Sequence, residues 1–342
     1  MTVKEMDGTE MKRRTHRKAL SGTWKRRGGA GCALMVLLLA AGCQEQASDA
    51  PSNRKIRLGF PALSATVFPL VYAQEKGIFE QEGVEVEMTR IRGVARIVAT
   101  LISGDIDVGW MGFDGMTNAV SQGAEELRYI GEFLKELPQS LVVAPHIKTF
   151  DDLRGQTIAT AGTGSHTDTL FFEGLRRGGL LNPRKDTLYL NLAGAENRLT
   201  QLLNGTVVAS SLKVPFVQLA EERGFKILQY QGNLMEPWGG EGLVTHTRVI
   251  SSKTEALKGL VTGMIRALQE MQDKRAEAVE LAAEYLALEP AMAEKVYDHM
   301  MPIFKADGKW NPEGIQRTLD EKTGPERRMD VTQFVDDVFL ER

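Results

Sequence analysis

The segment AGTGSHTD, residues 161–168, combines two glycines, two threonines and a serine between an alternating segment and a helix-like one. Three kinds of site use such a segment: a phosphate-binding loop, a sharp turn that presents a nucleophilic serine, and the mouth of a small-molecule pocket. A Walker-type phosphate loop needs a lysine and a hydroxyl residue after its last glycine, but Gly164 is followed by Ser165 and His166. The sequence therefore excludes the first kind of site.

A nucleophile turn of the G-x-S-x-G type is excluded as well, because Thr163 and Thr167 stand two residues before and after Ser165 where glycines are needed. What remains is a strand, a glycine turn and a helix that begins at Ser165 or Thr167. Such a start leaves backbone N–H groups unpaired and directs the positive end of the helix dipole outward, which favours an anion. Helix capping alone is the simpler alternative, but it does not explain the paired glycines. We therefore expect this segment to contact an anionic ligand.

Two further loops are expected to face a ligand because they follow strands of an open α/β sheet, whose ligands bind at the carboxyl ends of the strands. These loops are SAT, residues 64–66, and WMGFDG, residues 110–115. Trp110 and Phe113 could form an apolar wall, and Asp114 could be a polar anchor. Trp110 could equally belong to the core, and Asp114 could be a helix N-cap.

A third aromatic candidate, Trp238, lies between a proline and two glycines in EPWGGE, residues 236–241, where the chain is expected to cross between two units. An aromatic residue in such a place is a lid over the ligand or a wedge at a hinge. We favour the lid.

Constellations for catalysis or metal binding are absent from the sequence. Beyond the first 43 residues the histidines are His146, His166, His246 and His299, and no two of them have ligand spacing. We predict a protein that is not an enzyme, with no catalytic residue, no metal and no cofactor.

The elements that must position these residues form two similar units in series. Strands and helices alternate from residue 55, and a second series of the same kind begins near residue 146. This rhythm is typical of mainly parallel sheets covered by helices. An apolar alternating stretch, residues 242–250, and a helical tail complete the chain. The fold class is α/β with two lobes, and a ligand cleft is expected between them.

The first 43 residues differ from the rest. They carry nine basic and three acidic residues and then an apolar run, CALMVLLLAAG, that ends at Cys43. This is typical of a secretory signal and is too short for a settled membrane span. LLAAGC also resembles the lipobox of bacterial lipoproteins, so we predict cleavage before Cys43 and lipidation of this cysteine. A plain signal peptide is the alternative.

Removal of this leader leaves an acidic chain. The whole sequence has 42 basic and 45 acidic residues, so the mature part has 42 − 9 = 33 basic and 45 − 3 = 42 acidic residues. An acidic domain argues against nucleic acid as a partner. Cys32 and Cys43 are the only cysteines, so the mature fold contains no disulfide.

Several segments together resemble the substrate-binding proteins of ABC importers for sulfonates, taurine, nitrate and thiamine-precursor pyrimidines. They are FPLVYAQEKGIFEQEGVEVEM, LISGDIDVG, TFDDLRGQTIATAGTGS and LLNGTVVASSLKVPFVQLAEERGF, in this order and within residues 55–245. The resemblance implies a type II periplasmic-binding-protein-like fold, in which two lobes joined by two crossover strands close around one solute. The implied family contacts are Ser64, Thr66, Gly112, Phe113, Asp114, Gly164, Ser165 and His166.

The resemblance also implies partners and boundaries. We expect an extracytoplasmic, membrane-anchored monomer that serves an ABC permease and its ATPase subunits. The expected segments are a signal peptide (1–43), a flexible tether (44–54), the first part of lobe 1 (55–145), lobe 2 (146–236), and the return to lobe 1 with the C-terminal helices (237–342).

A sulfonate-like organic anion is the favoured solute, because AGTGS could hold its head group and Lys213 could reach the cleft. A heterocyclic or cationic solute, such as a thiamine-precursor pyrimidine, is the alternative, because Asp114 would repel an anion. A lyase-type enzyme on the same fold and a ligand-sensing lipoprotein without a permease are further alternatives.

Overall fold

The computed structural model describes residues 51–62, 64–163, 165–232, 234, 239–323, 329–336 and 338–340. Cys43, the predicted signal peptide and most of the predicted tether lie outside the described residues, as do Gly164 and Trp238. Among the described residues, no helix combines the length and the apolar character that a membrane crossing requires.

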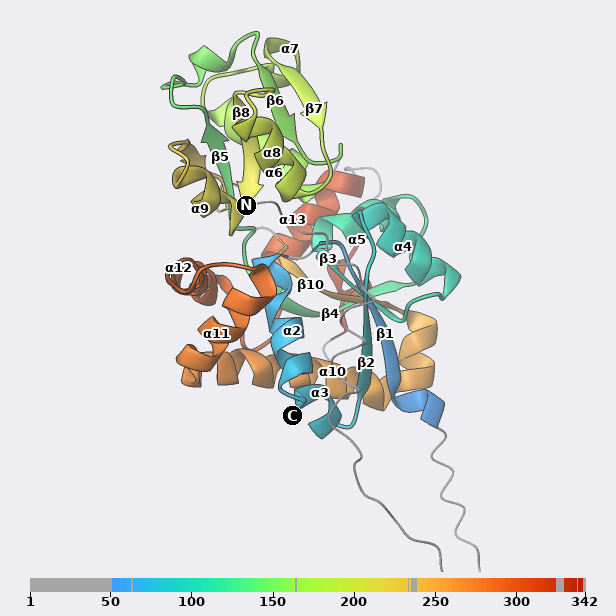
Figure 1. Ribbon diagram of the computed structural model, residues 1–342. Coiled ribbons are helices and arrows are strands. Elements are labelled where there is room, and N and C mark those ends of the chain that lie inside the picture. The colour runs from blue at the N-terminus through green and yellow to red at the C-terminus, as the bar shows by residue number, and fades with distance from the viewer. Residues whose placement is uncertain are drawn as a thin grey trace, which may run out of the picture. The chain divides into compact units, whose positions relative to one another are not determined.

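The first sheet, sheet A, has the strand order β2-β1-β3-β10-β4 (Figure 1). Strand β1 is parallel to β2 and β3, whereas β10 is antiparallel to its neighbours β3 and β4. The sheet is therefore mixed, and one central strand comes from far along the chain. Its strands are β1 (Lys55–Phe60), β2 (Glu85–Arg90), β3 (Val108–Gly112), β4 (Leu127–Leu134) and β10 (Glu241–His246).

Helices cover both faces of sheet A and enclose two apolar clusters. One cluster joins β1 to α2, α10, α11 and α12, and the other joins β3 to α4, α5 and α13. The bounds are α2 (Phe68–Glu75), α3 (Ile78–Gln81), α4 (Val94–Ser103), α5 (Phe113–Ser121), α10 (Thr247–Asp273), α11 (Arg275–Leu286), α12 (Pro290–Met300) and α13 (Pro312–Thr323). We call sheet A and these helices the first lobe.

The long helix α10 begins directly after β10, although the alternating pattern predicted an extended stretch to residue 250. His246 ends the strand and caps the helix, because its Nδ1 accepts from Arg248 N at 3.2 Å. Farther along, a Cβ at Gly259 would collide with the carbonyl of Glu82. Glycine therefore allows the chain after α3 to approach α10 closely.

The second sheet, sheet B, has the order β7-β6-β8-β5-β9 and the same mixed pattern. Strand β6 is parallel to β7 and β8, and β5 is antiparallel to β8 and β9. The strands are β5 (Gln139–Val143), β6 (Thr157–Thr160), β7 (Leu188–Asn191), β8 (Ala209–Lys213) and β9 (Lys226–Tyr230). With α6 (His166–Arg177), α7 (Pro183–Asp186), α8 (Ala195–Leu203) and α9 (Phe216–Glu221) they form the second lobe.

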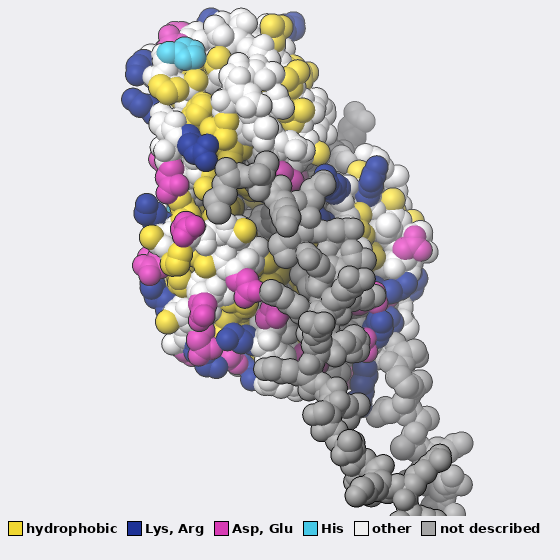
Figure 2. All heavy atoms as spheres, in the orientation of Figure 1, with side chains coloured by type: hydrophobic (Ala, Val, Ile, Leu, Met, Phe, Trp, Pro, Cys, Tyr) yellow, Lys and Arg dark blue, Asp and Glu magenta, His cyan; other side chains and the backbone are white. Residues whose placement is uncertain are grey.

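The chain crosses from sheet A to sheet B after β4 and returns before β10. The sequence suggested that the second unit begins at residue 146, whereas β5, residues 139–143, already pairs within sheet B. Each lobe has a core of its own, since separate apolar clusters pack on the two faces of sheet B. Figure 2 shows acidic and basic side chains interspersed over the visible face, without a large patch of one sign.

Candidate functional site

The loop after β1 presents two hydroxyls at the carboxyl edge of sheet A. Ser64 precedes a short 3₁₀ helix, η2 (Ala65–Val67), and its Oγ lies 2.9 Å from Thr66 Oγ1. Thr66 is buried and Ser64 is partly exposed. This pair of hydroxyls is held in place by the loop and not by a helix cap, because the side chain of Ser64 makes no cap hydrogen bond.

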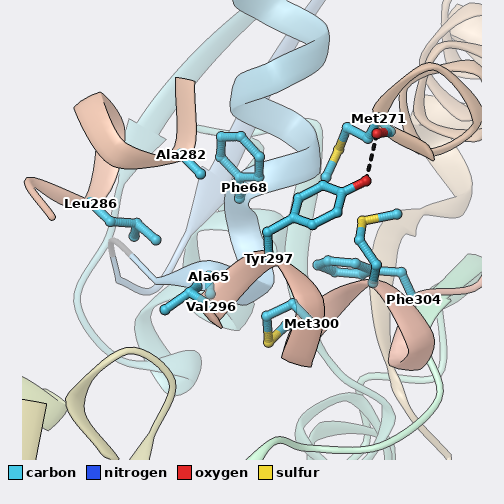
Figure 3. A pocket seen from close by; sticks show the side chains of 10 residues that line it. Ala65, Phe68, Met271, Ala282, Leu286, Val296, Tyr297, Met300 and Phe304 are labelled. Atoms are coloured by element: carbon cyan, nitrogen blue, oxygen red, sulfur yellow. Dashed lines mark hydrogen bonds between the residues drawn. The ribbon is translucent and has the colours of Figure 1, made fainter. Parts of the chain in front are cut away.

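Ala65 fixes this loop against an apolar pocket formed mainly by α2, α11 and α12 (Figure 3). The pocket encloses ≈ 10 Å³, about the room that one water molecule needs. At one side of it, Tyr297 Oη donates to the carbonyl of Met271 at 2.6 Å, the dashed line in Figure 3. Since protein side chains nearly fill it, this pocket supports the loop and offers no room for a solute.

The segment between β3 and α5 lies at the same edge of sheet A. Gly112 is the last residue of β3 and precedes α5, whose first turn contains Asp114. Phe113 is fully buried and packs edge-on against Tyr129, with 5.2 Å between the ring centroids. Asp114 is buried as well. Burial of Tyr129 is the largest cause that raises the pKa of its hydroxyl, and the nearby charge of Asp114 adds to this rise. Both side chains therefore lie within the first lobe in this conformation.

Trp110 belongs to the core of the first lobe, one of the two readings that the sequence allowed. It is fully buried, and its ring stacks on Phe133 at 6.4 Å. Its Nε1 donates to Glu241 Oε2 at 3.3 Å, and Lys213 Nζ lies 3.3 Å from the other oxygen, Oε1. One carboxylate at the start of β10 thus connects the indole in sheet A with the last residue of β8 in sheet B.

In the second lobe, Ser165 is the N-cap of α6, and its Oγ accepts from Asp168 N at 3.2 Å. Asp168 lies in the first turn, 1% exposed, and accepts from Arg184 Nη2 at 2.6 Å. Nearby, Asn191 Nδ2 donates to Thr163 Oγ1 at 3.0 Å. The capping interpretation of Ser165 is therefore realised, and a buried carboxylate already faces the positive end of the helix.

Three predicted site residues near α6 and the crossover lie wholly or partly outside the described residues. His166 begins α6, but its side chain, like Gly164 and Trp238, lies outside what the structure describes. The remaining candidates gather at the carboxyl edges of β1, β3, β6 and β8. The ligand-binding roles of Ser64, Thr66, Trp110, Gly112, Phe113, Asp114, Gly164, Ser165, His166, Lys213 and Trp238 stay predictions.

Charged residues that the sequence analysis did not single out lie at these same edges. Arg90 ends β2, and its Nη2 donates to Glu196 Oε1 at 3.2 Å, so the pair joins sheet A to the first turn of α8 in the second lobe. Applying the strand-end rule to β2, and not only to β1 and β3, could have identified Arg90.

Arg198 is a second cation that was missed. It is 3% exposed, and its Nε and Nη1 donate to the carbonyls of Ser211 and Leu192, each at 2.8 Å. Burial lowers the pKa of Arg198 to about 10. Because these two acceptors are neutral carbonyls, neither hydrogen bond cancels the positive charge of Arg198. The edge of sheet B thus carries a buried cation.

None of the predicted site residues lines either of two hollows in the described structure. One is the small pocket behind Ala65, and the other is an open hollow of ≈ 520 Å³ between α6 and α7. At the facing edges of the sheets, the pairs Arg90–Glu196 and Lys213–Glu241 bridge the two lobes. No group of three or more His, Cys, Asp or Glu side chains suited to a metal ion occurs within the described ranges.

This two-lobed arrangement is the fold of the periplasmic binding proteins. The alkanesulfonate-binding protein SsuA of Xanthomonas axonopodis pv. citri, bound to MOPS, has a TM-score of 0.68 and 20% identity and covers 83% of this chain and 99% of its own. The periplasmic aliphatic sulphonate binding protein SsuA of Escherichia coli has a TM-score of 0.66 and 20% identity and covers 83% and 92%.

Residues 49–287 match the NMT1-like family, and the chain belongs to this family. A curated relative, "Putative binding protein YtlA" of Bacillus subtilis (strain 168), is 23% identical over 250 residues, which are 68% of this chain and 67% of that protein. The named relatives are binding proteins and not enzymes.

Proposed function

We propose that this protein is an extracytoplasmic solute receptor that binds a small, sulfonate-like organic anion between its lobes and delivers it to an ABC permease. The observation that carries the proposal is the pair of ionic bridges, Arg90–Glu196 and Lys213–Glu241, between the facing edges of the two sheets. Charged side chains from both lobes meet there, which is the arrangement that a receptor closing around a charged solute requires.

The groups at these edges favour an anion. Arg198 brings a buried positive charge to the edge of sheet B, and Lys213 ends β8 at the same edge. The start of α6 adds its backbone N–H groups, although Asp168 offsets part of their field. The two SsuA proteins carry names for sulfonate binding, and this supports the same class of solute here.

Delivery follows from the architecture that we propose. The chain crosses between the lobes twice, so the lobes can rotate about these crossings and enclose the solute. Lipidation of Cys43 would hold the receptor at the membrane beside its permease and ATPase subunits, with the receptor acting as a monomer.

A cationic or heterocyclic solute is the second candidate, and a specific observation favours it. Asp114, Glu132 and Glu241 lie close enough to Tyr129 that their charges contribute to raising its pKa, after burial. However, Lys305 Nζ lies 3.0 Å from Glu132 Oε1, and Lys213 neutralises Glu241. Glu132 and Glu241 are therefore already paired with lysines.

A melting-temperature screen of the purified chain tests the solute class. The panel is propane-1-sulfonate, taurine, nitrate, butyrate, propylamine and a pyrimidine amine. A ligand present at about 100 times its dissociation constant should add about 2.7 kcal/mol to the unfolding free energy. Stabilisation by the sulfonates supports the proposal. Stabilisation by the amines alone would favour the second candidate, a cationic or heterocyclic solute.

A further inference from the structure

Arg90 has a buried N–H donor for which the described residues provide no acceptor. A guanidinium presents five N–H donors in a planar fork. Nη2 is bound to Glu196, but Nε is buried and has no acceptor among the described residues. In register, Arg90 stands beside Phe60, the last residue of β1, so this unused donor lies next to the loop that carries Ser64.

Tyr285, from α11, has the same deficit beside the same loop. Its ring stacks on Phe68 with 5.9 Å between centroids, and its hydroxyl is buried without a hydrogen-bond partner in the described structure. Burial is the largest influence on the pKa of Tyr285 and raises it, while the Ser64 N–H and Arg90 act to lower it. The two polar groups that lower this pKa are thus a donor and a cation, and neither can accept the hydroxyl proton.

Leaving such donors unpaired is costly. A buried donor without an acceptor costs about 1–3 kcal/mol, and more when it is charged. Such groups in a folded protein call for an explanation, which is a bound water or a ligand. A water could serve the hydroxyl of Tyr285, but two donors without acceptors, one of them on a guanidinium, fit an oxyanion better.

The opposite lobe strengthens this assignment. The buried carboxylate of Asp168 sits in the first turn of α6 and is paired with Arg184. The positive end of that helix is therefore partly neutralised inside the protein. Arg90 differs, because its Nε–H has no acceptor in the described structure, while the neighbouring Nη2 donates to Glu196.

We infer that Arg90 Nε and the Tyr285 hydroxyl donate to one oxyanion of the solute, a sulfonate, carboxylate or phosphonate, and so bind the charged head group to the first lobe. This inference rests on the proposed function. Arg90 and Tyr285 are specificity-determining residues that touch the solute, and Glu196 is a positioning residue that acts through Arg90. A lysine at position 90 would bind the oxyanion less well, because its ammonium group lacks the planar set of N–H donors of a guanidinium.

The test measures, by calorimetric titration of the purified chain, the affinity for four probes with the same alkyl chain: propane-1-sulfonate, butyrate, propylphosphonate and propylamine. The wild-type protein should bind at least one oxyanion and not the amine, and the order of the three oxyanions identifies the head group. Binding of the amine alone would overturn the inference but leave a solute receptor. Binding of no probe, and of no member of the wider screen, would overturn both.

Two tyrosine variants separate ligand contact from stability. Tyr285→Phe removes an unpaired hydroxyl, so the ligand-free melting temperature should stay equal or rise, while oxyanion affinity falls at least fivefold. Tyr297→Phe is the matched control, because it removes the bond to Met271 O and should lower the melting temperature without changing affinity. Unchanged affinity in Tyr285→Phe would overturn the inference and identify a water as the partner of the hydroxyl.

Two further variants separate ligand contact from a bridge between the lobes. Arg90→Lys keeps the charge but loses the fork, and should weaken oxyanion binding at least tenfold. Glu196→Gln removes the charge of this pair but keeps an amide oxygen as acceptor for Nη2, so it should weaken oxyanion binding clearly less than Arg90→Lys does. Equal losses in the two variants would overturn the inference, because Arg90 would then serve only to bridge the lobes.

Discussion

Lys213 and Glu241 join the two sheets through an ion pair in which Nζ lies 3.3 Å from Oε1. Lys213 is the last residue of β8 and Glu241 is the first residue of β10, so the pair spans from sheet B to sheet A. The second oxygen of Glu241 accepts from Trp110 Nε1, which fixes the carboxylate against the core of the first lobe. A solute that enters between these edges meets a lysine that is already paired.

Replacing this carboxylate tests the sign of the solute's charge. Glu241→Gln keeps an oxygen for Trp110 but releases Lys213, so an anionic solute should bind about threefold or more tightly, since a partly exposed ion pair contributes up to about 1 kcal/mol. Lys213→Met should weaken the binding of the same solute. Titration with propane-1-sulfonate measures both. Weaker binding in Glu241→Gln would show that the carboxylate itself contacts a cationic group.

The helix cap at the second lobe gives a prediction for stability and binding together. Ser165→Ala removes the acceptor for Asp168 N and should cost about 1 kcal/mol of unfolding free energy. It should also weaken solute binding several-fold if the α6 start contacts the head group. His246→Ala removes the cap of α10 at the far end of β10 and serves as the control. An equal loss of affinity in both variants would reject a role of Ser165 in binding.

Asp107 holds the opposite edge of sheet A through a buried ionic network. It is 3% exposed and accepts from Arg57 N at 2.8 Å, from Arg57 Nη2 at 2.9 Å and from Lys253 Nζ at 3.0 Å. Asp107→Asn leaves two cations without their carboxylate and should cost at least about 2 kcal/mol, reduced from the fully buried case because Arg57 is partly exposed. Urea unfolding at neutral pH measures this loss.

The same network predicts how stability depends on pH. Burial acts to raise the pKa of Asp107, but the hydrogen bonds from Arg57 and Lys253 prevail, and the net pKa is lowered. Its stabilisation is therefore complete above the unfolded value of about 3.9 and is lost as the pH falls through the lower folded value. Between about pH 5 and pH 2 the wild-type protein should lose more stability than Asp107→Asn. Parallel curves for the two proteins over this range would contradict the assignment.

A steric prediction concerns the central strand β10. A Cβ at Gly242 would collide with the carbonyl of Gly131 in β4. Gly242→Ala should therefore lower the unfolding free energy by about 2 kcal/mol or more. Gly162→Ala is the control, because a Cβ there meets nothing within 4 Å and should leave the stability nearly unchanged. Thermal melts followed by circular dichroism compare the two, and equal melting temperatures would contradict the close packing of β10.

Much of the fold follows from the order of alternating and helical segments. The expected alternation of strands and helices from residue 55 is present in both lobes, and a strand such as β4 is buried on both faces. The boundary between β10 and α10 was not predictable in this way, because no glycine or proline separates them and the N-cap, His246, is not one of the usual capping residues. Pairing of β10 between β3 and β4 depends on contacts far apart in sequence, which periodicity cannot reveal.

The candidate site was predictable in position more than in detail. The strand-end rule found the loops of Ser64 and Ser165, which the structure places at the carboxyl edges of the two sheets. It did not reveal that Phe113 and Trp110 are fully buried, because an apolar residue after a strand is compatible with a wall or with a core. Tyr285 was unpredictable, since it reaches the site from a helix about 220 residues beyond Ser64.

The place of β10 in sheet A also determines the order in which the chain can complete its parts. Sheet B is made from one continuous stretch, residues 139–230, and can form as soon as that stretch is available. Sheet A is incomplete until residues 241–246 insert between β3 and β4. Before that, β3 and β4 have no common neighbour and cannot form one sheet. A chain that folds as it is synthesised, from the N-terminus onward, would therefore complete its second lobe before its first. Until β10 pairs, the edges of β3 and β4 are exposed, and pairing with a strand of another chain is most expected at this stage.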